Sequence, residues 1–483
     1  MSGEPGEVAE QDCTEFLAGV GLRCILVTVP VDRTDPAAGN MQVSVAIRPG
    51  TGDESLAPLA VLQGGPGGAS SELAAFLPSR PYTQVLIDQR GVGFGSTNFW
   101  CFELLVVLIE IIEASQDEAD AIASEALAEC SDRLKQDPVF THTTTAAHAA
   151  DVVDVMAALG YEEWLVYGVS YGTAIALEVL RNPPATLAGA VLDGVYPRDL
   201  DLDAAIAAGA DRAIRELDAE CSVDPACSAI LAGATNPEGA TMAELLTELI
   251  RRFDADPRVV NLAAEETTMQ EPIAVLVDGV SVAGAVFQLL YNEFTATLVP
   301  AMLAGLAGAD QAGTANGDDV GSAARLVAVL VVEIASRQAH SGSPATNAAV
   351  TCAEWLPLAS GPPAEAGAFG AAIVGDGVSE QCEPWAIAAS ERVAPPPEVD
   401  LPVLLISGWF DPITPPSFAE AVAERLAAVT HIVSRTRGHG IWVWGYDSCV
   451  DRIVADFLTE PGSELDTACA SEGRPLRWQP LPQ

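Results

Sequence analysis

One serine of the chain lies in a sequence pattern that favours nucleophilic catalysis. Ser170 is the central residue of Gly168-Val-Ser-Tyr-Gly172, which follows an apolar run and leads directly into an alanine-rich stretch. A strand that turns sharply into a helix needs small residues beside the turn, and it holds the serine hydroxyl exposed at the helix N-terminus. The pattern therefore predicts a serine nucleophile, although a glycine-rich turn with an ordinary serine fits the same residues.

A serine nucleophile requires a base, and His439 is the best candidate among the five histidines. It lies in Arg437-Gly-His-Gly440, after the last predicted strand, where the glycines let the backbone turn and aim the imidazole across the edge of a sheet. His148 falls in a helical pattern and His431 in a strand, so both are expected to be structural. The other two, in polar loop-like sequence, are His142 and His340.

Asp411 is the predicted acidic partner of this histidine. It follows an apolar strand in Ser407-Gly-Trp-Phe-Asp-Pro-Ile-Thr-Pro415, a loop stiffened by two prolines, 28 residues before His439. The chain order serine, aspartate, histidine is that of α/β-hydrolases and differs from that of chymotrypsin-like and subtilisin-like enzymes. These three residues predict acyl transfer, in which the histidine moves the serine proton and the aspartate orients the imidazole.

A glycine-rich segment is the candidate for stabilising the charge that develops on a reacting carbonyl oxygen. Gln63-Gly-Gly-Pro-Gly-Gly68 follows the third predicted strand, and backbone N–H groups can approach a carbonyl closely where no side chain obstructs them. We assign the oxyanion hole to the N–H groups of Gly65 and Tyr171. A phosphate-binding loop is the rival interpretation, but the Lys-[Ser/Thr] pair that it requires is missing from this segment.

These residues need a sheet whose strands end at one edge. Apolar and β-branched runs predict eight strands: Ile25–Val29, Gln42–Ile47, Leu59–Gln63, Gln84–Asp88, Trp164–Gly168, Ala190–Asp193, Val403–Ser407 and Thr430–Val433. The later runs are continuously apolar, as expected for parallel strands that helices cover on both faces. Helices are predicted at 145–159, 171–181, 417–427 and 447–458.

Between the sixth and seventh strands, the sequence becomes alanine-rich and helical until a proline run at 395–397, with a loop at 308–321. We therefore predict a core formed by residues 1–199 and 399–483, interrupted by a cap of residues 200–398. The fold class is α/β. We expect an α/β-hydrolase fold with a mostly parallel eight-stranded sheet, helices on both faces and a large, mostly helical cap after strand six.

The charge of the chain excludes several partners. Asp and Glu number 67 against 23 Lys and Arg, giving a net charge of -44, and Lys135 is the one lysine. Nucleic acid and acidic membranes are therefore not expected to bind. No apolar window reaches the roughly 18 to 20 uncharged residues of a membrane span. We expect a monomer without a cofactor, and no metal, because no further ligands stand at a zinc-like spacing from His142 and His148.

Ten cysteines without a C-x-x-C pair argue against a zinc ribbon or a thioredoxin-like site, and they favour disulfides formed in an oxidising compartment. We expect bonds between neighbours along the chain: Cys13–Cys24, Cys101–Cys130, Cys221–Cys227, Cys352–Cys382 and Cys449–Cys469. Ten reduced cysteines in a cytosolic enzyme are the alternative. The first residues carry neither a basic region nor an apolar stretch, so we expect a removed signal peptide and a secreted, periplasmic or cell-envelope protein.

The motifs taken together resemble a family. QGGPGG, IDQRGVGFGST, YGVSYGT, LDGVYPRD, SGWFDPITP and RGHG resemble the secreted tripeptidyl aminopeptidases and their proline iminopeptidase relatives among the α/β-hydrolases. The resemblance implies an exopeptidase that cuts short peptides from a free N-terminus. Gln63 departs from the histidine common in proline iminopeptidases, which favours the tripeptidyl branch. Asp88 and Arg90 are expected to be buried and paired beneath the oxyanion loop, with a direct substrate role as the alternative.

An exopeptidase must hold a protonated α-amino group with a partly desolvated carboxylate. Glu354, whose loop a Cys352–Cys382 bridge would hold rigid, is the candidate. Two other functions stay open: a secreted carboxylesterase or lipase-type hydrolase of the same fold, and a catalytically inactive α/β-hydrolase that binds a partner. Acetylation of the peptide N-terminus separates an aminopeptidase from an esterase, and labelling by a fluorophosphonate separates an enzyme from an inactive binding protein.

Overall fold

The computed structural model describes residues 3–52, 56–95, 98–232, 241–308, 321–340, 344–361, 363–375, 377–390, 398–444 and 447–481. Its centre is a nine-stranded sheet in the order β1-β2-β3-β5-β4-β6-β7-β10-β11. These strands are β1 Val8–Gln11, β2 Arg23–Pro30, β3 Asn40–Arg48, β4 Leu59–Leu62, β5 Gln84–Ile87, β6 Trp164–Val169, β7 Leu187–Asp193, β10 Val403–Gly408 and β11 Val429–Ser434.

The strand order confirms the mostly parallel α/β sheet. The pairs from β5 through β4, β6, β7 and β10 to β11 are parallel, whereas the pairs among β1, β2, β3 and β5 are antiparallel. All eight predicted strands are present. The ninth, β1, escaped prediction because its sequence, Val-Ala-Glu-Gln, is short and largely exposed, so it has no apolar face to reveal it.

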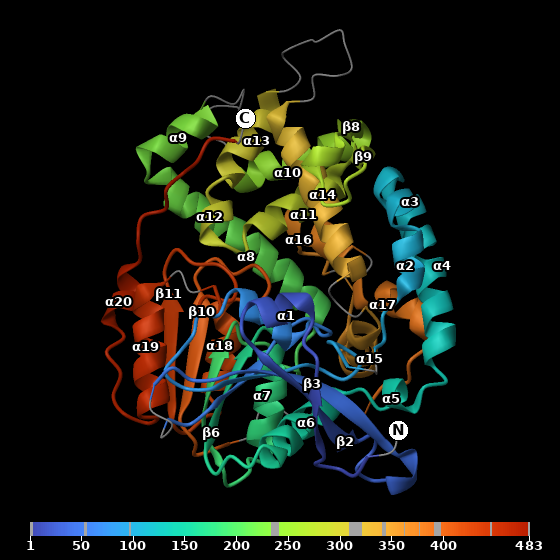
Figure 1. The fold of residues 1–483 in the computed structure, drawn as a ribbon. Coiled ribbons are helices and arrows are strands. Elements are labelled where there is room, and N and C mark those ends of the chain that lie inside the picture. Colours follow the sequence, from blue (N-terminus) through green and yellow to red (C-terminus); the bar gives the residue numbers. More distant parts are fainter. Residues whose placement is uncertain are drawn as a thin grey trace.

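Helices cover both faces of the sheet, as Figure 1 shows. Alternate residues of the strands point to opposite faces, so that Leu62 packs on the face covered by α6, α7 and α18, whereas Val61 packs on the face covered by α19. The helices outside the segment between β7 and β10 are α1 Glu15–Gly19, α2 Phe102–Val106, α3 Leu108–Glu113, α4 Gln116–Leu134, α5 Pro138–Thr141, α6 Thr145–Ala158, α7 Tyr171–Arg181, α18 Pro416–Ala423, α19 Ser448–Thr459 and α20 Ala468–Glu472, with short 3-10 turns at Pro36–Ala38 and Ser70–Ala75.

The segment between β7 and β10 lies above the ends of the strands and builds a second apolar core (Figure 1). Its helices are α8 Leu202–Ser222, α9 Pro225–Ala232, α10 Met242–Ala255, α11 Gly279–Leu289, α12 Glu293–Ala296, α13 Val299–Gly308, α14 Ser322–His340, α15 Pro344–Glu354, α16 Ala368–Val374 and α17 Gly377–Cys382, with 3-10 turns at Ala264–Glu266, Leu356–Leu358 and Glu383–Trp385. The segment is mostly helical, but it also contains an antiparallel pair, β8 Arg258–Leu262 and β9 Ile273–Val277.

Packing does not follow the predicted boundaries at 199 and 399. Helix α3 precedes the cap in the sequence, yet Leu108 and Ile112 belong to the cap core. Helices α15 and α17 lie inside the predicted cap, yet their buried residues pack with the sheet. The C-terminal tail also leaves the sheet after α20, and Trp478 packs against the cap. We therefore propose that the cap consists of 202–340 and 368–374, with α2–α3 and the tail packed against it.

The structure pairs the ten cysteines in the predicted order: Cys13–Cys24, Cys101–Cys130, Cys221–Cys227, Cys352–Cys382 and Cys449–Cys469. The predicted proline run at 395–397 and most of the predicted loop at 308–321 lie outside the described residues. None of the helices in the described part of the chain combines the length and the apolar character that crossing a membrane requires.

Candidate active site

Ser170 occupies a sharp turn between β6 and α7. Its backbone has φ 57° and ψ -128°, a conformation that residues other than glycine rarely adopt. Its N–H donates to Asp193 O at 2.9 Å. The flanking glycines are required for the close approach of the backbone. A Cβ at Gly168 would lie 2.4 Å from Gly172 O, and a Cβ at Gly172 would lie 2.2 Å from Leu62 O. The local geometry is therefore that of a nucleophile elbow.

The glycine-rich loop after β4 lies directly against this serine. A Cβ at Gly64 would stand 2.6 Å from Ser170 Cβ, so only glycine fits there. The N–H groups of Gly65 and Tyr171 have no hydrogen-bond acceptor among the residues that the structure describes. Both were predicted as oxyanion donors. Two uncommitted N–H groups beside the serine are the arrangement that an oxyanion hole requires.

Gln89 holds the glycine-rich loop in shape, a role that the sequence analysis missed. Its side-chain Oε1 accepts from Gly67 N at 2.8 Å, and its Nε2 donates to the carbonyl oxygens of Gln63 and Gly64 at 3.0 and 2.9 Å. The Nε2 group also lies 3.2 Å from Gly68 O. One buried amide thereby satisfies several backbone groups of a loop that has no regular structure. Its place inside IDQRG was the available signal.

The expected pairing of Asp88 with Arg90 is wrong, although both side chains are buried. Asp88 accepts from the backbone N–H and the hydroxyl of Ser71, and burial raises its pKa to about 7. Arg90 instead binds Asp151 with Nε and Nη2, at 2.6 and 2.9 Å. Both residues follow β5, but their side chains bind different parts of the chain. Asp88 therefore supports the turn after the glycine-rich loop, and Arg90 ties the strand end to α6.

His439 and Asp411 form a buried pair after β11 and β10. His439 Nδ1 lies 2.9 Å from Asp411 Oδ2 and also 2.9 Å from Thr414 Oγ1. Thr414 in turn donates its hydroxyl to Asp411 Oδ2 at 2.6 Å, and the N–H groups of Ile413 and Thr414 donate to Oδ1. The carboxylate has no exposed surface. It is thereby fixed by four donors and can orient the imidazole by its Nδ1–H group.

Thr414 is a second residue whose role was not predicted from the sequence. Its hydroxyl stands between the carboxylate and the imidazole, within hydrogen-bond distance of both. The pattern Asp-Pro-Ile-Thr gave a signal, because a threonine three residues after an aspartate in a turn commonly closes a hydrogen bond back to it.

The surroundings of His439 adjust its acidity. Burial lowers the pKa of His439, but the Asp411 carboxylate, its hydrogen bond and the nearby Asp193 raise it more, so the pKa lies above the ordinary 6.5. Asp193 is itself buried at the end of β7, and burial raises its pKa to about 6 while it accepts from Trp442 N and Ile441 N. The imidazole is therefore held in a site that stabilises its protonated form.

Ser170 and His439 face the same edge of the sheet, but no hydrogen bond joins Ser170 Oγ to the imidazole. A Cβ at Gly194 would lie 3.1 Å from His439 Cε1, and the neighbouring Asp193 carbonyl accepts from Ser170 N. On the other side, a Cβ at Gly440 would lie 3.2 Å from the Val169 side chain. Catalytic hydrogen bonds often tighten only when substrate is bound.

The loop that carries His439 is fastened from both the core and the cap. His439 N donates to Tyr291 O at 2.8 Å, and the Tyr291 ring packs edge-on against the imidazole with centroids 5.0 Å apart.

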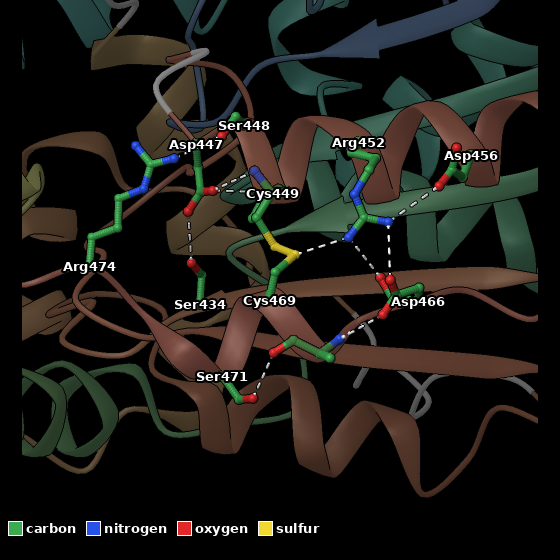
Figure 2. The surroundings of a disulfide bond; sticks show 12 residues. Ser434, Asp447, Ser448, Cys449, Arg452, Asp456, Asp466, Cys469, Ser471 and Arg474 are labelled. Carbon is green, nitrogen blue, oxygen red and sulfur yellow. Dashed lines mark hydrogen bonds and ion pairs between the residues drawn. A yellow bond between two sulfur atoms is a disulfide. The ribbon is translucent and has the colours of Figure 1, made fainter.

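Arg437, two residues before His439, binds Asp447 with Nε at 2.9 Å and also binds Glu293. Asp447 caps α19 by accepting from Cys449 N, and it accepts from Ser434, as Figure 2 shows beside the Cys449–Cys469 disulfide.

The Glu354 carboxylate, which was predicted to bind the substrate amine, is already engaged by other residues of the chain. Its side chain is buried, and its Oε2 atom binds Arg198 Nη2 at 2.8 Å. The same oxygen accepts from Thr145 Oγ1 at 2.7 Å, and Oε1 accepts from Thr145 N at 2.8 Å. The Thr145 hydroxyl continues to Tyr171 OH at 2.9 Å. Glu354 therefore joins α15 to α6 and α7 beneath the serine, with its charge already paired.

The remaining histidines have other surroundings. His148 is buried with Nδ1 3.0 Å from Tyr171 OH, and burial lowers its pKa to about 3. His431 lies in β11 and bonds to Ser407 Oγ, whereas His142 contacts Asp32 at the surface. His340 is the last residue of α14 and not part of a loop. Among the described residues, one group could place three ligand atoms around a metal, Cys101, Glu103 and Cys130, but its two sulfurs form a disulfide.

Comparison with known proteins identifies the fold and its distant relatives. Residues 57–218 match the family model described as alpha/beta hydrolase fold, and residues 366–469 match the one described as TAP-like protein. The serine protease Hip1 of Mycobacterium tuberculosis is 27% identical over 224 residues, which are 43% of this chain and 43% of that protein. A probable proline iminopeptidase of Streptomyces coelicolor is 30% identical over 139 residues, 29% of this chain and 32% of that protein.

The matches thus span less than half the length of these curated relatives. Among solved structures, the proline iminopeptidase of Mycobacterium smegmatis is 17% identical with a TM-score of 0.41, covering 90% of this chain and 97% of that chain. The alpha/beta hydrolase match contains Ser170, and the TAP-like match contains both Asp411 and His439.

Proposed function

We propose that this chain, an α/β-hydrolase with a TAP-like C-terminal segment, is an extracytoplasmic serine exopeptidase of the tripeptidyl aminopeptidase type. The observation that carries the proposal is the buried His439–Asp411 pair at the sheet edge where Ser170 occupies a nucleophile elbow. Gly65 of the glycine-rich loop and Tyr171 of α7 supply uncommitted N–H groups beside the serine. Nucleophile, base, orienting carboxylate and oxyanion donors are the four parts that acyl transfer requires.

The proposed mechanism assigns one step to each group. Ser170 Oγ attacks the carbonyl carbon of the scissile peptide bond while His439 Nε2 takes up its proton. The Gly65 and Tyr171 N–H groups stabilise the oxyanion, and His439 then returns the proton to the leaving amine as the C–N bond breaks. Water next attacks the acyl-enzyme, again with His439 as base, which releases the peptide and restores the serine. Asp411 stabilises the imidazolium in each step.

Two observations support a peptidase outside the cytoplasm. The curated relatives with matching segments are named as a serine protease and as proline iminopeptidases. The ten cysteines are all joined in five disulfides, which persist in oxidising compartments and are rare in the cytosol. Together they favour a peptidase that meets its substrates outside the cytoplasm.

Blocking the N-terminus of the substrate tests the proposal. The wild-type protein should hydrolyse tripeptide p-nitroanilides that carry a free α-amino group, and acetylation of that group should lower kcat/KM by at least about 100-fold, since a buried ionic contact is lost. The Ser170→Ala variant should lose about 10⁶-fold in kcat while retaining its thermal melting curve. It should also fail to react with a fluorophosphonate that labels the wild type.

The alternatives give different results in the same assay. A carboxylesterase would hydrolyse p-nitrophenyl esters and would cleave neither peptide. An inactive binding protein would not be labelled by the fluorophosphonate at all. Equal rates on free and acetylated tripeptides would contradict the exopeptidase assignment while leaving the serine hydrolase in place.

A further inference from the structure

A half-open cavity of about 390 Å³ lies between the glycine-rich loop and the helices around it. Its volume falls within the range of sites that bind small ligands. Its lining includes Pro66 of the glycine-rich loop, and Leu104 and Leu108 of α2 and α3. Figure 1 shows α2, α3 and α4 on the flank of the molecule beside α17 and α14, and residues of these helices line the cavity.

The glycine-rich loop both contacts the serine and lines the cavity. Gly64 touches Ser170, since a Cβ there would stand 2.6 Å from Ser170 Cβ, and Pro66 of the same loop lines the cavity. Two Cα–Cα steps span at most about 7.6 Å. An extended peptide advances about 3.3 to 3.6 Å per residue, so a side chain about two residues from the scissile carbonyl would reach the cavity.

The lining is neutral in a strongly acidic chain. None of the side chains that line the cavity carries a charge, although 19% of the residues of the chain do. Leucine, isoleucine, alanine, proline and tryptophan side chains form most of the surface. The polar ones are amides, and Asn347 is engaged with Pro66 O at 3.4 Å and Gln381 Nε2 at 3.1 Å. A charged side chain would lose its hydration here without gaining an ionic partner.

We propose that this cavity binds an apolar side chain of the peptide substrate, about two residues from the scissile bond, and that it thereby sets a preference of the enzyme. The inference rests on the proposed exopeptidase function, because it assigns a subsite to the same serine. A leucine-sized side chain gains from burial against Leu104, Leu108 and Ile111, whereas an alanine leaves most of the cavity to water.

A matched pair of substitutions on α3 tests this subsite. Ile111 lines the cavity, whereas Ile109, two residues earlier on the same helix, is 41% exposed and does not. Ile111→Trp should fill the cavity, and Ile109→Trp adds the same bulk outside it. The substrates are tripeptide p-nitroanilides with a free N-terminus, Ala-Ala-Ala and the three peptides that carry leucine at one position. Wild type should prefer leucine at one of these positions by about 10-fold or more.

With that substrate pair, Ile111→Trp should lower kcat/KM for the preferred leucine peptide by at least about 10-fold and for Ala-Ala-Ala by less than about twofold. Ile109→Trp should change neither. Ala335→Phe, at a lining residue from α14, should have the same effect and provides a second test if Ile111→Trp folds poorly. Equal loss on both peptides, or no loss on either, in folded variants would overturn the subsite.

Failure of the proposed function gives a different result. If the wild type cleaves none of these peptides but hydrolyses p-nitrophenyl esters, the exopeptidase assignment fails, and the peptide subsite fails with it. The same variants on p-nitrophenyl acetate and hexanoate then show whether the cavity accepts an acyl chain instead. If the peptides are cleaved without preference, the exopeptidase assignment stands and the subsite alone is contradicted.

Discussion

Two buried carboxylates, Asp411 and Glu354, have nearly the same hydrogen bonds but different partners. Asp411 accepts from a threonine N–H, from the hydroxyl of the same threonine and from one further N–H. Glu354 likewise accepts from the N–H and the hydroxyl of one threonine, Thr145. The remaining partner of Asp411 is the imidazole of His439, whereas that of Glu354 is the guanidinium of Arg198.

The partner decides what each carboxylate can do. Arginine stays protonated at every accessible pH, so the Glu354–Arg198 pair is a permanent link between α15 and the residues that follow β7. Histidine gains and loses a proton near neutral pH, so the carboxylate beside His439 can stabilise a positive charge that the imidazole acquires during a reaction. Burial and hydrogen bonding of an acid therefore do not by themselves indicate catalysis, and the titratable partner does.

Replacing Asp411 should have the largest effect on the rate and should show most clearly how this carboxylate differs from Glu354. Asp411→Asn keeps the shape of the side chain but removes the charge that stabilises the imidazolium and selects its tautomer. We expect kcat on the cleaved tripeptide to fall by about 10⁴-fold, with the denaturation midpoint nearly unchanged. Steady-state kinetics with active-site titration checks the first part, and chemical denaturation checks the second.

Glu354→Gln is the matched control for that variant. It removes a charge from a carboxylate with the same hydrogen bonds, and it should leave kcat within about 10-fold of wild type because it touches no reacting atom. A loss of about 10⁴-fold in this control, or its absence in Asp411→Asn, would contradict the division of roles between the two acids.

Breaking the permanent pair should affect stability instead of rate. Arg198→Met leaves Glu354 and Glu178 without their shared guanidinium, and Glu354 is almost fully buried. Removing one partner of a buried ion pair costs about 3–5 kcal/mol, so the free energy of unfolding measured in urea should fall by about that amount. The double variant Arg198→Met with Glu354→Leu should recover part of the loss, because no unpaired charge then stays buried. No recovery would show that packing and not charge is responsible.

The same contrast explains what the sequence could predict. Ser170, Asp411 and His439 could be proposed from the sequence because each lies in a short segment with glycines or prolines that constrain the backbone locally, as the Cβ clashes at Gly168 and Gly172 show for Ser170. The strands that carry them have continuous apolar runs, which is why eight of the nine were predicted.

Contacts between distant parts of the chain left no such local pattern. Glu354 and Arg198 are 156 residues apart, so nothing in either neighbourhood predicts that the carboxylate is already paired. Gln89 supports a loop more than twenty residues earlier, and α2–α3 pack against a cap that begins about a hundred residues later. These features depend on which surfaces meet after folding, and a single sequence contains that information only through the complete fold.

Removing the hydroxyl of Thr414 or of Thr145 tests the smallest expected difference between Asp411 and Glu354. Catalysis needs neutral His439, so kcat/KM should fall as the pH falls through its pKa, which lies above 6.5 in the wild type. Thr414→Val removes the hydroxyl that donates to Asp411 Oδ2, so the carboxylate keeps more of its negative charge for the imidazolium. The acid limb of the pH profile should therefore move to higher pH, and kcat above it should fall by about 2- to 10-fold.

Thr145→Val makes the same change beside Glu354, where no titrating partner is present to respond. It should lower stability by about 2 kcal/mol, because it removes two buried hydrogen bonds, to Glu354 and to Tyr171, and it should leave the midpoint of the acid limb where it is in the wild type. Profiles of kcat/KM between pH 5 and 9 for both variants, with melting curves at each pH, decide the matter. Equal shifts in the two variants would mean that the threonines act through the fold, and a shift in Thr414→Val alone would mean that the hydroxyl acts through the charge of Asp411.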